Sequence, residues 1–122
     1  ISSGRTLCRL DGTVMGPCPL TDPDRFIDTN AMLFGRGAFK VLHQWVLMPP
    51  YGHLIGDRIM LHHLKESGVK REHLDQHSVF YRCSKAGLYK QMNETIPPGV
   101  QKRPDYETSF RAWEADGHSP LV

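Results

Sequence analysis

The segment that most restricts the fold runs from Asp57 to Gly68, where apolar residues recur at the spacing of one helical face. Met60, Leu61 and Leu64 form the apolar stripe, and Asp57 is a residue type that caps helices. Gly68 is typical of the position that ends a helix. We therefore predict an amphipathic helix here that packs on a core through one side only.

The first 24 residues predict a β-hairpin followed by a proline-rich loop. Asp11-Gly12 is a two-residue hairpin signal between short apolar and polar runs. The stretch "GPCPLTDPD" then breaks regular structure, because each proline removes a backbone donor and restricts its neighbour. We expect residues 25–122 to form the core of a single domain spanning 1–122.

Residues 38–48 are compatible with two structures. A helical face would collect Ala38, Val41, Leu42, Trp45 and Met48, whereas alternate residues from Phe39 to Leu47 would form one strand face. Pro49-Pro50 ends the element in either case. We favour a strand.

The C-terminal half predicts further short elements. The stretch "VKREHLDQH", 69–77, is interpreted as a short helix and "SVFYRC", 78–83, as a short strand. Ser84 can cap a helix over 84–93, and an amphipathic segment surrounds Phe110 and Trp113. The fold class expected is therefore α+β, a small mixed sheet with two to three short helices.

Composition and charge narrow the function classes. Apolar residues make up 39% of the 122 residues and charged residues 23%, which fits a folded protein rather than a disordered tail. No apolar run approaches the ~20 residues that cross a bilayer, so we expect no membrane-spanning segment. The chain starts at Ile1 with no basic and apolar leader, so we expect a processed piece or one module of a longer, secreted polypeptide.

The net charge of +2 is unevenly placed. Residues 57–103 hold nine Lys/Arg and five Asp/Glu, a balance of +4, and the remainder carries −2. A basic centre between more acidic ends suits a phosphate-rich partner such as nucleic acid. Ordinary scatter of solvated surface charge explains the same numbers equally well.

The three cysteines, Cys8, Cys18 and Cys83, form neither a CxxC motif nor a zinc-binding spacing with histidine. Their odd number leaves at least one thiol free or paired between chains. A Cys8–Cys18 bridge would require an exported protein. We favour their role as small buried apolar residues.

Three fragments, in this order, resemble the non-specific DNA/RNA endonucleases of the ββα-metal (His-Me finger) type, especially those at the ends of bacterial secreted toxins. They are "GHLIGDR", then "HLDQHSVFYRCSKAGLYKQMNETI", then "KRPD" followed later by "DG". They cover roughly residues 50–117, with an insertion between the first two and a deletion before the third. The resemblance implies a ββα-metal finger, hydrolysis of nucleic-acid phosphodiesters and an inhibitor or immunity protein as a partner.

The resemblance also assigns roles to single residues. His53 would be the general base, because an imidazole titrates near working pH. Arg58 would hold the phosphate, and a hydrated Mg²⁺ would be bound from the 84–93 helix. Asn93 and Glu94, at the end of that helix, are our candidate metal ligands. Asp75 and Gln76 could also hold a metal, and the spacing selects none of the four.

The chain departs from the family pattern where the metal should bind. The metal-holding asparagine of the family falls on Lys85, which has no lone pair while protonated. The glutamate that ends the motif falls on Asn93, and Tyr51 stands where active members have Asp or Arg. Three alternatives follow: the finger is rebuilt with other residues, the activity is lost, or the match arises by chance.

The stretch "CSKAGLYKQMNETIPPGV" also resembles the recognition helix and proline turn of excisionase-like helix-turn-helix proteins. Ser84 would cap that helix, and Lys85 and Lys90 would reach phosphates or base edges. Tyr89 shares a helical face with Lys85 at four-residue spacing. The predicted nucleic-acid-binding residues are therefore Lys85, Tyr89 and Lys90. The second hypothesis is therefore a DNA-binding domain without catalysis. The third is a protein-interaction module with neither activity, in which His53 only bonds a neighbouring loop.

Overall fold

The computed structural model describes residues 1–121 and has a three-stranded mixed sheet. The strands are β1 (Ser2–Cys8), β2 (Val14–Pro17) and β3 (His73–Arg82), arranged in the order β2-β1-β3. The central strand β1 is antiparallel to β2 and parallel to β3. With its short helices, this sheet confirms the predicted α+β class.

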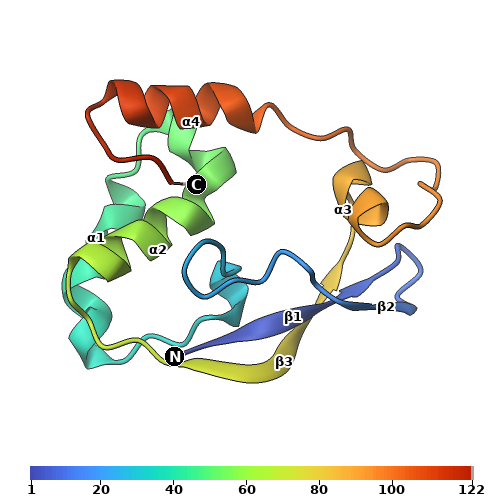
Figure 1. The fold of residues 1–122 in the computed structure, drawn as a ribbon, viewed down its shortest axis with the longest axis horizontal. Coiled ribbons are helices and arrows are strands. Elements are labelled where there is room, and N and C mark those ends of the chain that lie inside the picture. The colour runs from blue at the N-terminus through green and yellow to red at the C-terminus, as the bar shows by residue number, and fades with distance from the viewer. Residues whose placement is uncertain (122) are drawn as a thin grey trace.

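Four α-helices and three 3₁₀ helices accompany the sheet in the described residues. They are η1 (Thr29–Ala31), η2 (Arg36–Ala38), α1 (Phe39–Val46), η3 (Pro50–Ile55), α2 (Gly56–Glu66), α3 (Ala86–Gln91) and α4 (Tyr106–Ala115). Figure 1 shows α1, α2 and α4 grouped beyond one end of the sheet and α3 near the other end. The segment from α3 to α4 runs from one group to the other (Figure 1). Among residues 1–121, no helix has the length and apolar character needed to cross a bilayer.

The predicted N-terminal hairpin is confirmed. Strands β1 and β2 pair from Thr6↔Pro17 to Cys8↔Val14, on either side of the turn that contains Asp11. The Asp11 carboxylate accepts hydrogen bonds from the backbone and the hydroxyl of Thr13. This local bonding explains why Asp11-Gly12 signals a turn.

The predicted amphipathic helix is also confirmed, with two differences in detail. Helix α2 starts at Gly56, so Asp57 lies in its first turn and does not cap it; the Asp57 carboxylate accepts from Thr29 instead. After the helix, Gly68 has φ +69°, the left-handed conformation that favours glycine. The apolar stripe is buried as the pattern indicates.

Two predicted elements are wrong. Within residues 38–48, Phe39–Val46 form helix α1 rather than a strand, because Val41 packs with Met60 and Leu64 of α2. The short helix expected over 69–77 is replaced by the start of β3, whose backbone pairs with β1. In both cases a partner distant in sequence selects one of two locally acceptable structures.

The apolar core has three parts. One lies between the sheet and α3 and contains Leu7, Cys18, Cys83, Leu88 and Tyr89. The second joins α1 to α2, and the third joins η3, α2 and α4 around Trp113. All three cysteines of the described chain are buried free thiols, which agrees with their predicted apolar role.

Candidate functional site

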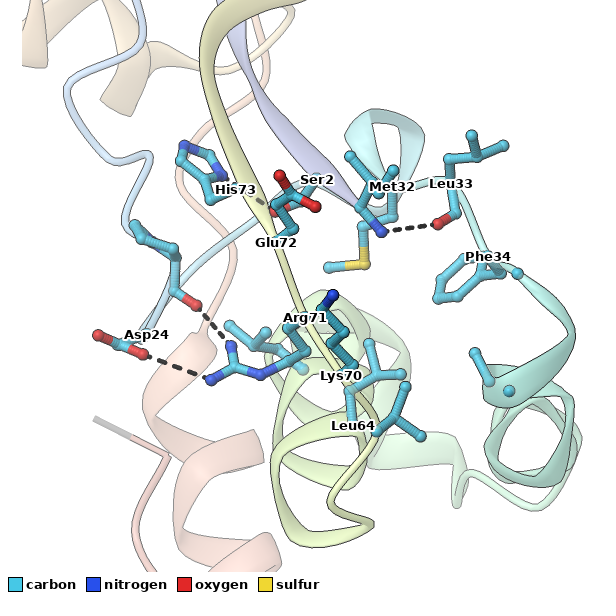
Figure 2. Close-up of a pocket in the computed structure, with 17 residues that line it drawn as sticks. Ser2, Asp24, Met32, Leu33, Phe34, Leu64, Lys70, Arg71, Glu72 and His73 are labelled. Atoms are coloured by element: carbon cyan, nitrogen blue, oxygen red, sulfur yellow. Dashed lines mark hydrogen bonds and ion pairs between the residues drawn. The ribbon is translucent and has the colours of Figure 1, made fainter.

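Two cavities of about 440 Å³ each open on the surface. The first lies where the start of β1, the segment before β3 and helix α2 meet, and Figure 2 shows its lining. Met32, Phe34 and Leu64 are among its apolar lining residues, while Arg71 approaches Asp24 to 3.6 Å. Its two basic side chains, Lys70 and Arg71, are matched in number by two acidic ones, Asp24 and Glu72, so the charged side chains provide no basic excess for a phosphate.

The second cavity, called the cleft from here on, lies between the sheet with α3 on one side and helices α2 and α4 on the other. Four basic and two acidic side chains line it together with four aromatic rings. These are Arg5, Arg58, Lys85 and Arg103, then Asp28 and Asp57, then Phe26, Tyr81, Tyr106 and Phe110. The excess of basic over acidic groups makes the cleft attractive to anions.

The innermost cation, Arg5 of β1, is held rigidly. It is 6% exposed, and its Nη1 donates to Asp28 at 2.5 Å. Its guanidinium lies 4.2 Å from the centre of the Tyr81 ring. Burial opposes its charged form, but hydrogen bonds and charge interactions with Cys18 and Asp28 outweigh this and raise the pKa of Arg5. Arg5 therefore stays charged at the base of the cleft.

Arg58 and Lys85 are cations without an acidic partner among residues 1–121. Arg58 lies 5.1 Å from the Phe26 ring and 5.8 Å from the Phe110 ring, and donates to a backbone carbonyl. Burial lowers the pKa of Arg58, because the charged form loses water. Lys85 donates to the Tyr106 hydroxyl at 3.5 Å. Both side chains retain donors for a bound anion.

Asp57 contributes a carboxylate to the same cleft. Its Oδ1 accepts from the backbone N–H of Thr29 at 3.2 Å and from the Thr29 hydroxyl at 2.7 Å. Within the described chain no group donates a hydrogen bond to Oδ2. Burial raises the pKa of Asp57, and the nearby Asp28 charge adds to this, while the Thr29 bonds act against it.

Of the residues predicted from sequence, the structure brings Arg58 and Lys85 together at the cleft. His53 does not line it: this residue is exposed in η3, while its neighbours Leu54 and Ile55 reach the cleft. The element before His53 is helix α1, so no β-hairpin presents the imidazole as a ββα finger would. The predicted finger is therefore not formed around His53.

Of the two predicted metal ligands, Glu94 is paired with Arg9 and Asn93 is exposed. Both carboxylate oxygens of Glu94 accept from Arg9, at 2.8 and 2.5 Å. Asn93 follows α3 in a left-handed conformation, φ 54°. Across residues 1–121 no three His, Cys, Asp or Glu side chains are grouped to hold a metal. Glu94 could therefore bind Mg²⁺ only if its ion pair with Arg9 opened.

The helix-turn-helix interpretation is also corrected. The element that precedes α3 is strand β3, and Ser84 does not cap α3, whose N-cap is Lys85. Tyr89 is 1% exposed and bonds Leu10 and Cys83 through its hydroxyl, so it supports the core and is closed to nucleic acid. Lys90 is exposed but does not line the cleft.

Sequence reasoning missed most of the cleft. Arg5, Asp28 and the aromatic rings come from β1, β3, α4 and the segments between elements. No motif joins these positions, since each is an ordinary residue in its local pattern. Sequence analysis identified only Arg58 and Lys85 of the lining as phosphate-binding residues, together with the basic excess of residues 57–103.

Comparison of the chain with protein-family models, with curated proteins and with solved structures found no match.

Proposed function

We propose that this protein binds single-stranded nucleic acid in the cleft. The observation that carries the proposal is that Arg58 and Lys85, two cations without acidic partners in the described chain, line one cavity that also contains aromatic rings. Cations and aromatic rings together match the two chemical parts of a nucleotide, its phosphate and its base.

The phosphate would be held by charge. A phosphate that meets Arg58 and Lys85 releases counterions, and that release is the main source of affinity in nucleic-acid binding. The guanidinium of Arg58 also offers a planar set of donors to phosphate oxygens. Arg5 and Asp28 neutralise each other, and Arg103 is paired with Glu107, so the positive charge that an anion would meet comes from Arg58 and Lys85.

The base would be held by stacking. Tyr106 and Phe110 of α4, Tyr81 of β3 and Phe26 line the cavity from several sides. Stacking of a base on an aromatic side chain contributes roughly 1–3 kcal/mol. Bases in a duplex are already stacked, so a recessed aromatic lining favours a single strand. A volume of about 440 Å³ lies within the usual range of ligand pockets.

Hydrolysis by His53 with Mg²⁺, the expectation from the resemblance, has less support. His53 lies outside the cleft, and Glu94 is occupied by Arg9.

The test is a fluorescence anisotropy titration with labelled single-stranded RNA and DNA at several salt concentrations. Wild type should bind with a steep salt dependence, and Arg58→Ala or Lys85→Ala should each reduce the slope of log K against log salt by roughly 0.7. Lys40→Ala removes the same charge from α1, outside the cleft, and is the matched control. Absence of binding, or an equal effect of the control, would overturn the proposal and favour a protein-interaction module.

A further inference from the structure

We propose that the cleft cleaves RNA, with Asp57 as the general base that accepts the proton of a ribose 2′-hydroxyl. This inference rests on the proposed binding function and adds a reaction and a substrate class to it.

Asp57 has the geometry of a positioned base. The two hydrogen bonds from Thr29 hold its Oδ1, at 3.2 and 2.7 Å, and fix the orientation of the carboxylate. Its Oδ2 is left without a donor among residues 1–121 and belongs to a side chain that lines the cleft. A base must be both oriented and free to accept a proton, and Asp57 meets both requirements.

Its neighbours make Asp57 a better base than an ordinary aspartate. Burial and the Asp28 carboxylate both raise the pKa of Asp57, which increases its attraction for a proton. The second carboxylate, that of Asp28, is buried and accepts a hydrogen bond from Arg5, so it is not free for the same role.

Arg58 and Lys85 supply the second requirement of phosphodiester cleavage. Attack on phosphorus adds negative charge to the phosphate oxygens in the transition state. Arg58 directly follows Asp57 in α2, and Lys85 lines the same cavity from the N-terminus of α3. Cations already in place stabilise that developing charge without reorganisation.

RNA is the expected substrate class because its 2′-hydroxyl is a nucleophile within the substrate itself. The aliphatic hydroxyl of the lining, that of Thr29, already donates to Asp57. In RNA the 2′-hydroxyl is covalently held beside the phosphorus, so its attack is intramolecular and strongly favoured. DNA lacks this group and would bind without reacting.

The reaction is a transesterification. Asp57 accepts the 2′-hydroxyl proton while the 2′-oxygen forms a bond to phosphorus. The bond between phosphorus and the 5′-oxygen breaks, and the departing oxygen takes a proton from water. The hydroxide left by that water then removes the proton from Asp57. The products are a 2′,3′-cyclic phosphate and a 5′-hydroxyl end.

The test incubates the protein with labelled single-stranded RNA and with the same sequence made of 2′-deoxynucleotides, in the presence of a chelator. Wild type should cut only the RNA, and mass spectrometry should find the cyclic phosphate. Asp57→Asn should slow cleavage at least about a hundredfold. The asparagine oxygen can still accept both Thr29 bonds, and Asp24→Asn, on an exposed carboxylate outside the cleft, is the matched control.

The outcomes separate the two proposals. RNA bound but left intact by wild type would overturn this inference and leave the binding function standing, whereas absence of binding would overturn both. Equal cutting of the deoxy strand, or full activity of Asp57→Asn, would overturn the role of the 2′-hydroxyl or of Asp57. The pH profile of wild type adds a test that needs no variant: cleavage should decline on acidification from a pH above 3.8, the ordinary aspartate value. A decline that begins only at that ordinary value would count against Asp57.

Discussion

The imidazole of His118 stacks on the indole of Trp113, with ring centroids 3.7 Å apart and ring planes inclined by 15°. Trp113 is 2% exposed, and its Nε1 donates to the backbone carbonyl of Ser119 at 2.8 Å. His62 and His63 of α2 meet the same indole edge-on, at 5.3 and 6.1 Å. Three histidines thus surround Trp113, which contacts both helix α2 and the segment that follows α4.

This arrangement predicts a loss of stability in mild acid. Burial lowers the pKa of both His62 and His63, and His118 lowers both further. Lys65 also lowers the His62 pKa and Glu66 opposes the shift, while His43 of α1 lowers the His63 pKa. The unfolded chain therefore binds protons more readily than the folded one at these sites. The free energy of unfolding should be level above about pH 6.5 and should fall as the pH drops below it.

Urea denaturation at a series of pH values measures this effect. The variant with His62→Gln and His63→Gln should show a flatter dependence over the same window. Asp57 acts in the opposite sense, because its raised pKa makes acidification favour the folded state. This effect falls at lower pH than that of the histidines, where carboxylates titrate. Stability that increases as the pH falls through 6.5 would contradict the prediction.

The buried pair of Arg5 and Asp28 should behave as a unit. Both side chains are at most 7% exposed, so removal of either leaves an uncompensated charge in the interior. Asp28→Asn or Arg5→Met should each lower the free energy of unfolding by about 3–5 kcal/mol. The double variant should lose less than the sum of the single losses, as measured in a double-mutant cycle.

The exposed pair of Arg103 and Glu107 is the control for that cycle. These side chains are 60% and 55% exposed, and removal of either should cost less than about 1 kcal/mol. Additive losses at Arg5 and Asp28 would show that the two do not interact energetically.

Gly52 is predicted to tolerate no side chain. A Cβ there would lie 2.7 Å from Cγ of Met48 and 2.9 Å from Cδ1 of Ile59, which is 1% exposed. Gly52→Ala should therefore lower stability by about 1–3 kcal/mol through overpacking. A Cβ at Gly87 in α3 would meet no atom of the described residues within 4 Å, so Gly87→Ala should stabilise the protein by up to about 1 kcal/mol. Thermal unfolding would rank the two, and equal melting temperatures would refute the packing at Gly52.

Tyr89→Phe tests the structural role of a residue first interpreted as nucleic-acid-binding. The hydroxyl accepts from the backbone N–H of Leu10 at 3.0 Å and donates to the Cys83 carbonyl at 3.3 Å. Its removal should lower stability by about 1–3 kcal/mol and leave nucleic-acid affinity unchanged. Tyr51→Phe removes an exposed hydroxyl bond to Asp116 and should have a smaller effect in the same denaturation experiment. Weakened binding by folded Tyr89→Phe would restore its interpretation as a contact residue.

Elements whose signals are local were predictable from the sequence. The hairpin at Asp11, helix α2 and the amphipathic segment around Trp113 each follow from residues within a few positions of one another. The burial of the cysteines followed from their chemistry. These features need no distant partner to choose between alternatives.

Elements with two compatible patterns were decided by tertiary packing. The periodicity of 38–48 permits strand or helix, and the contact of Val41 with Met60 and Leu64 selects the helix. His73 begins a strand because β1 offers a backbone ladder beside it. In each case burial or pairing against a remote segment outweighs a weak local preference.

The residue types of Arg58 and Lys85, and the basic centre that contains them, were determined by the sequence alone. The tertiary structure decided that these two have no acidic partner within residues 1–121. It also decided that Glu94 is bound by Arg9 and that Asp57 lies near Asp28. The physical reason is that charge pairing, loss of water and pKa depend on distances through space. Chain order sets such distances only over a few residues.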